Sequence, residues 1–129
     1  MHSLLEKEHQ QLIDLLEVLD KCVSKGQSKD QVYKHLDDFV TLAEEHFKNE
    51  EEIMETYKYT DIVNHKNEHT SLLEQLYSLR SKLRDGHAPF GTDYMKLLRK
   101  WLEDHLLDTD NKLEEFLYQV NANNNITNN

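Results

Sequence analysis

Residues that interrupt helices are scarce in this chain. It has 3 glycines and 1 proline in 129 residues, and it is rich in lysine, leucine and glutamate. Glycine and proline are the strongest helix breakers and turn formers, so their scarcity disfavours strands and hairpins. A chain of this length can bury one hydrophobic core but is short of two. The composition therefore predicts a single all-α domain.

Cysteine pairs and long apolar runs are lacking as well. Cys22 has no second cysteine to pair with, so an internal disulfide is excluded, which suits a reducing compartment. No apolar run approaches the roughly 18 residues of a membrane span. The start, MHSLLEKEHQ, does not have the basic and then apolar layout of a signal peptide. We therefore expect a soluble, cytoplasmic protein.

Positive charge is in short supply. Lysine and arginine number 15 against 25 acidic residues, which gives a formal net charge of −10. Such a surface repels both a nucleic-acid backbone and an anionic membrane. Neither nucleic acid nor a membrane is expected as a partner.

Apolar residues recur in steps of three and four along four segments, which is the spacing of amphipathic helices. The stripes are Leu5, His9, Leu12, Leu16, Leu19 and Val23; Val32, Leu36, Phe39, Ala43, His46, Glu50, Met54 and Tyr57; His65, His69, Leu72, Leu76, Leu79 and Leu83; and Tyr94, Leu98, Trp101 and His105, then Asp110, Leu113, Leu117 and Val120. Ser28 is a plausible N-cap of the second helix. Four such helices joined by short loops predict an up-down-up-down antiparallel four-helix bundle over residues 1–120. Residues 121–129, NANNNITNN, are expected to form a disordered tail.

Polar residues interrupt all four stripes. A lone histidine on an apolar face is usually a satisfied core residue, but every stripe here carries one, and two stripes carry a carboxylate. Burying such groups without partners is costly. His65 and His69 also have the i, i+4 spacing that helices use to chelate a metal. Up-down topology brings the whole set toward one end of the bundle, which predicts a metal site. The candidate ligands are His9, His46, Glu50, His65, His69, His105 and Asp110.

The candidate ligands restrict the metal. Imidazole and carboxylate without thiolate suit iron, zinc, copper or manganese. The set exceeds the four ligands of a tetrahedral zinc, which favours two metal ions. With both carboxylates and one oxygen atom bridging, five histidines would fill all but one position of two octahedral ions. The remaining position would be open to a small ligand.

Three motifs resemble the signatures of hemerythrins. HFKNEEEIM matches HFxxEExxM, HKNEH matches HxxxH, and WLEDHLLDTD matches WLxxHxxxxD, and the similarity extends from about Leu5 to about Tyr118. The resemblance implies a non-haem centre of two iron ions (Fe2+/Fe3+) with an oxo or hydroxo bridge. His65, His69 and His105 would hold one iron, His9 and His46 the other, and Glu50 and Asp110 would bridge them. Leu107, Phe47 and Trp101 match residues that line the ligand pocket.

The third motif contains an unusual spacing. His105 and Asp110 are five residues apart, so in a regular α-helix their directions would differ by about 140°, and Asp108 would fit better. The apolar stripe shifts phase at the same place. We therefore predict a locally widened, π-like turn between His105 and Asp110.

The resemblance implies reversible O2 binding, with O2 or small anions such as azide as partners, and no catalytic turnover. The alternative is a di-iron scavenger or oxidase that acts on peroxide, nitric oxide or iron. A plain helical bundle for protein interaction is the third possibility, and it would require five inward histidines to be satisfied without metal.

Overall fold

The described part of the chain is entirely helical. The computed structural model describes the backbone of residues 3–85 and 92–127, and the side chains of residues 5–85, 95–105 and 109–120. Its elements are α1 (Ser3–Ser24), α2 (Lys29–Thr56), α3 (Ile62–Asp85), α4 (Thr92–Asp104), the π-helix η1 (His105–Asp110) and α5 (Asn111–Thr127). None of the helices in these ranges is long and apolar enough to cross a membrane. The prediction of an all-α chain is confirmed.

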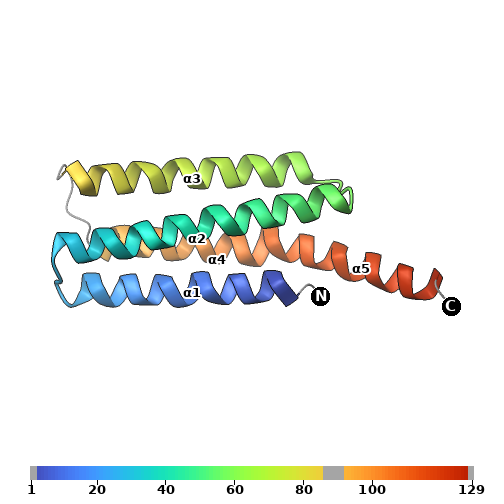
Figure 1. The fold of residues 1–129 in the computed structure, drawn as a ribbon, viewed down its shortest axis with the longest axis horizontal. Coiled ribbons are helices and arrows are strands. Elements are labelled where there is room, and N and C mark those ends of the chain that lie inside the picture. The colour runs from blue at the N-terminus through green and yellow to red at the C-terminus, as the bar shows by residue number, and fades with distance from the viewer. Residues whose placement is uncertain (1–2, 86–91, 128–129) are drawn as a thin grey trace.

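The helices lie side by side as four antiparallel rods (Figure 1). α4, η1 and α5 follow one another directly and form a single long rod. α2 packs against both α1 and α3, and α1 packs against α4. Each rod runs opposite to the one before it, as the sequence predicts. This alternation brings the start of α1, the end of α2 and the start of α3 to the same end of the molecule.

Local sequence signals explain where α1 ends and α2 begins. Gly26 has a φ of +65°, a left-handed conformation that glycine adopts without strain, directly after α1. Ser28 caps α2: its hydroxyl accepts from the backbone N–H of Gln31, and the Gln31 side chain accepts from the backbone N–H of Ser28. This reciprocal capping box confirms Ser28 as the N-cap.

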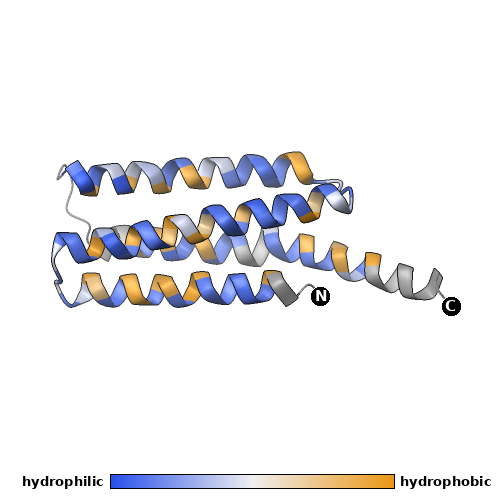
Figure 2. Ribbon diagram, viewed as in Figure 1, coloured by the Kyte–Doolittle hydropathy of each residue, from blue (hydrophilic) through white to orange (hydrophobic). Residues whose placement is uncertain are grey.

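The apolar core is divided into two clusters. The larger cluster, around Phe39 and Leu76, fills most of the bundle. The smaller one consists of Leu5, Met54, Tyr59, Leu113 and Leu117. Apolar and polar residues alternate along each helix (Figure 2), so one face of each helix can contribute to this core. The candidate ligands occupy the positions between the two clusters, where the dielectric is low and electrostatic interactions are strong.

The helical backbone continues past the boundary expected at residue 120. α5 ends at Thr127 and extends beyond the other rods (Figure 1). No proline interrupts this segment, and asparagine is only a moderately poor helix former, so its composition is compatible with a continued helix. The division into a bundle of residues 1–120 and a tail of residues 121–129 stays a prediction.

Candidate metal centre

The structure brings all seven predicted ligands together. They come from every rod of the bundle: His9 from α1, His46 and Glu50 from α2, His65 and His69 from α3, and His105 and Asp110 from the two ends of η1. His9 has a side chain that is 13% exposed, and the other six are at most 2% exposed. Removing seven polar side chains from water is costly in free energy, so these groups must interact strongly with one another to offset that cost.

Glu50 lies between two sets of histidines. Its Oε1 is 2.9 Å from Nε2 of His69 and 3.3 Å from Nε2 of His65. Its Oε2 is 3.3 Å from Nε2 of His46 and 3.5 Å from Nε2 of His9. Each oxygen of the Glu50 carboxylate therefore contacts a different pair of histidines.

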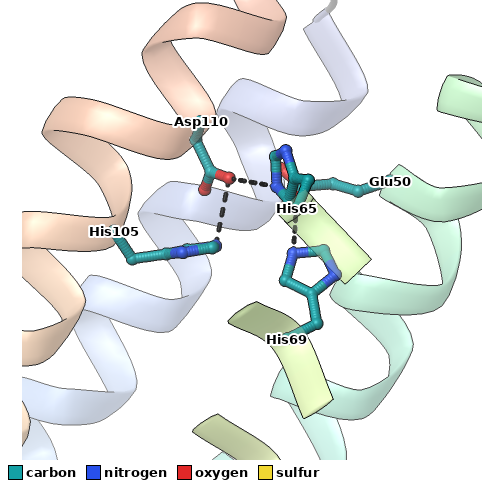
Figure 3. A group of neighbouring side chains, drawn as sticks. All are labelled: Glu50, His65, His69, His105 and Asp110. Carbon is teal, nitrogen blue, oxygen red and sulfur yellow. Dashed lines mark hydrogen bonds and ion pairs between the residues drawn. The ribbon is translucent and has the colours of Figure 1, made fainter. Parts of the chain in front are cut away.

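Asp110 repeats this division. Its Oδ1 is 3.1 Å from Nε2 of both His65 and His105, and Figure 3 shows these contacts. Its Oδ2 is 3.0 Å from Nε2 of His9 and 3.9 Å from Nε2 of His46. Both carboxylates thus present one oxygen to His9 and His46. The other oxygen faces His65 together with His69 in the case of Glu50, and His65 together with His105 in the case of Asp110.

Two overlapping groups of side chains could each hold a metal ion. One group is Glu50, His65, His69, His105 and Asp110; the other is His9, His46, Glu50 and Asp110. Among the described residues, several buried inward atoms make no well-directed hydrogen bond. They include Nε2 of His46, His69 and His105, although a carboxylate oxygen lies 2.9–3.3 Å from each of them. Unpartnered buried nitrogens that face carboxylate oxygens fit a pair of cations held between them. The donor set therefore fits two metal ions that share both carboxylates.

The π-helix η1 directs Asp110 toward the centre. The six residues from His105 to Asp110 form it, which confirms the predicted widened turn. In a π-helix the i to i+5 bonding places residues five apart about one turn from each other. His105 and Asp110 can therefore both face inward, and Asp110 is 1% exposed. The side chain of Asp108 lies outside the described residues.

The carboxylates hold protons on the histidines when no metal competes. Burial lowers the pKa of His9, His46 and His65, but the adjacent carboxylates of Asp110 and Glu50 outweigh burial. They raise the pKa of His9 and His65 to about 9 and that of His46 to about 10. Burial raises the pKa of Glu50 and Asp110, yet the surrounding histidines hold both well below their usual range. Metal ions must displace these protons.

An outer layer of acids holds the far nitrogens of the histidines. Nδ1 of His46 donates to Glu8 at 3.0 Å, and Nδ1 of His69 donates to Glu51 at 3.0 Å. Nδ1 of His105 lies 2.6 Å from Glu68. A carboxylate on Nδ1 fixes the tautomer and ring orientation, so that Nε2 is free to bind metal.

Sequence reasoning missed these outer acids, although a signal was present. Glu8 directly precedes His9, Glu51 follows Glu50, and Glu68 precedes His69. A neighbour in sequence is rotated by about 100° on a helix, so it faces the seam with the next helix. Each of these acids therefore holds a histidine of another rod. The Glu51 side chain is 32% exposed, and its Oε2 lies 3.0 Å from Nδ1 of His69.

Two of the three predicted pocket residues adjoin the centre. Phe47 is 2% exposed, and its ring stacks on His69 with centroids 4.0 Å apart. The Trp101 ring lies nearly parallel to His105 with centroids 6.4 Å apart. The side chain of Leu107 lies outside the described residues. Phe47 and Trp101 thus restrict the movement of two histidine rings.

Comparisons with known proteins agree with this geometry. The model of the hemerythrin HHE cation binding domain matches residues 1–117. Bacteriohemerythrin of Methylococcus capsulatus is 29% identical over 105 residues, which covers 81% of this chain and 79% of that protein. Myohemerythrin of Theromyzon tessulatum is 34% identical over 77 residues, which covers 60% and 58%.

Solved structures show the same fold. A crystal structure of wild-type hemerythrin superposes with a TM-score of 0.79 at 28% identity, covering 83% of this chain and 82% of that one. A leucine-to-alanine hemerythrin variant gives the same TM-score at 27% identity. Sequence, fold and the cluster of histidines and carboxylates lead to one conclusion: the chain belongs to the hemerythrin family.

Proposed function

We propose that the centre holds two iron ions and binds O2 reversibly. His65, His69 and His105 would hold one ion, His9 and His46 the other, and Glu50 and Asp110 would bridge them. The observation that carries this assignment is the division of both carboxylates, each of which presents one oxygen to each set of histidines. Hemerythrins are known for oxygen binding at non-haem di-iron centres, and the donor set here fits that chemistry.

The unequal histidine sets decide where a gas would bind. His65, His69 and His105 with two carboxylate oxygens would complete most of the coordination of the first ion. His9 and His46 would provide one ligand fewer to the second ion, so a small ligand would find its place beside them. The bound ions would supply two electrons that the gas can take up and return. Among the candidate ligands, His9 is the one nearest to solvent, and the other six side chains are shielded from water.

Reversible binding is the expected behaviour in solution. The protein loaded with iron is reduced without air, exposed to O2 and then evacuated, while its charge-transfer absorption is followed. We expect an oxygen-dependent band that disappears on evacuation and returns on re-exposure. The zinc-loaded protein is the matched blank, because zinc has the same ligands available but no redox chemistry.

Other outcomes separate the alternatives. Immediate decay to a stable di-ferric spectrum that shifts with azide would favour a scavenger or oxidase of peroxide, nitric oxide or iron. The absence of any oxygen-dependent band in the iron-loaded protein would contradict oxygen binding in either role.

A further inference from the structure

Glu68 on α3 contacts both ends of the π-helix. Its Oε1 lies 2.6 Å from Nδ1 of His105. The hydroxyl of Thr109 lies 2.7 Å from each oxygen of the same carboxylate and can donate to either. The Glu68 side chain is 35% exposed, so it is partly shielded from water. One carboxylate therefore holds the first residue of η1 and the residue directly before Asp110.

The Glu68 carboxylate attracts some residues of η1 and repels others. An ionised carboxylate accepts hydrogen bonds and donates none. His105 and Thr109 can both donate to it, whereas an aspartate at the same place would be repelled. Asp110 is the residue directly after Thr109, about a fifth of a turn further around the π-helix. With Thr109 held at the seam between α3 and η1, Asp110 is the residue that turns toward the centre.

A regular α-helix would present a different residue. His105 and Asp110 would then differ in direction by about 140°, and the carboxylate nearest to the direction of His105 would be Asp108. The six residues of η1 avoid this outcome by widening the turn. Widened turns of this kind are rare and occur frequently at functional sites. In the described residues, Glu68 contacts His105 and Thr109 of η1 from another rod.

We propose that Glu68 and Thr109 are positioning residues that keep η1 in the π form and thereby select Asp110 as the bridging carboxylate. Glu68 does this from α3, without facing the metal positions itself. The inference rests on the proposed metal centre, and it adds a reason why Asp110, and not Asp108, is the bridging carboxylate. It assigns Thr109, which is no candidate ligand, a defined role in metal binding.

Cobalt(II) titration of the metal-free full-length protein tests the proposal. We expect Thr109→Val, which keeps the side-chain size but removes the hydroxyl, to weaken cobalt binding about 10-fold. Glu68→Gln should weaken it by about 10–100-fold, the usual cost of losing an outer partner of a metal ligand. Thr109→Ser keeps the hydroxyl and should restore binding to within about twofold of the original. The double variant should lose about as much as Glu68→Gln alone, because both changes break one contact.

A second measurement does not require metal. In the nitrogen and proton NMR spectrum of the metal-free protein, the short bond to Glu68 should give His105 a strongly downfield Nδ1 proton, and Glu68→Gln should move it upfield. Glu74→Gln is the control, since Glu74 is an exposed residue of the same helix. It should change neither cobalt affinity nor this proton.

The outcomes are separable. Affinities of Thr109→Val and Glu68→Gln within about twofold of the unchanged protein would overturn the proposal, as would an equal loss in Glu74→Gln or no rescue by Thr109→Ser. Losses that simply add in the double variant would indicate general destabilisation and would also overturn it. If the unchanged protein binds no cobalt, the proposed function fails. The Nδ1 proton of His105 then tests the contact by itself: a downfield shift that Glu68→Gln removes supports the positioning role, and the absence of such a shift overturns it. If the variants do not fold, the presence or absence of the downfield proton in the unchanged protein decides between the same two results.

Discussion

Replacing Glu50 by alanine should abolish the binding of both metal ions at once. Its two oxygens face different sets of histidines, at 2.9–3.5 Å from the nearest Nε2 atoms. None of these four histidines contacts both oxygens of Glu50: His9 and His46 contact Oε2, and His65 and His69 contact Oε1. The loss of affinity should therefore exceed the roughly 10–100-fold that removal of an outer partner costs. Iron content per chain after anaerobic loading is the measurement.

The acidic run HFKNEEEIM provides the control for that variant. Glu52 belongs to the same run, is exposed and lies on the same helix. Glu52→Ala removes the same side chain and charge without touching the centre, so it should keep the full iron content. Equal iron content in Glu50→Ala and Glu52→Ala would show that Glu50 bridges nothing.

The second large effect is on how the free energy of unfolding depends on pH. We expect this free energy to fall with rising pH in the metal-free protein, and we expect metal loading to add the opposite dependence. In the metal-free protein the pKa values of His9, His46 and His65 are raised to between about 9 and about 10. The unfolded value is about 6.5. The folded protein therefore binds more protons than the unfolded chain between these limits. Their contribution is complete below about pH 6.5 and is lost as the pH rises through 9 to 10.

The carboxylates set the acid limit. The pKa values of Glu50 and Asp110 are held well below their usual range, so their contribution is present above the unfolded value of about 4 and is lost as the pH falls. Metal binding adds the opposite dependence, because the ions require neutral imidazole and displace protons. The metal-free protein should be most stable between about pH 4.5 and 6.5, whereas loading should stabilise it more as the pH rises.

Thermal unfolding at pH 6 and pH 9 measures both trends. For the chelator-treated protein we expect the melting temperature to fall by on the order of 10 °C, which corresponds to a few kcal/mol for a chain of this size. The difference between loaded and metal-free protein should grow over the same interval. His46→Gln should flatten the fall in the metal-free protein. A metal-free melting temperature that rises from pH 6 to pH 9 would contradict the assigned proton positions.

Much of the site can be predicted from sequence because each ligand lies in phase with an apolar stripe. His46 and Glu50 are one turn apart on α2, as are His65 and His69 on α3, so periodicity alone turns them inward. The step of five residues from His105 to Asp110 is out of phase with an α-helix, and that mismatch predicts the π-helix at its observed position. Turn and cap residues such as Gly26 and Ser28 mark the first helix boundary in the same direct way.

The outer partners could not be assigned, because their roles depend on the neighbouring rod. Glu8, Glu51 and Glu68 are off the apolar stripe, and off-stripe acids usually lie in solvent. Whether such an acid meets a histidine depends on the rotation and axial shift of two helices, which one stripe does not determine.

The ligand geometry places two metal ions between Glu50 and Asp110 in the proposed centre. Anomalous diffraction from a crystal of the iron-loaded protein, recorded on both sides of the iron absorption edge, tests it most directly. We expect two iron peaks per chain, one beside His9 and His46 and one beside His65, His69 and His105, with both carboxylates between them. A single peak, or peaks away from these side chains, would contradict it.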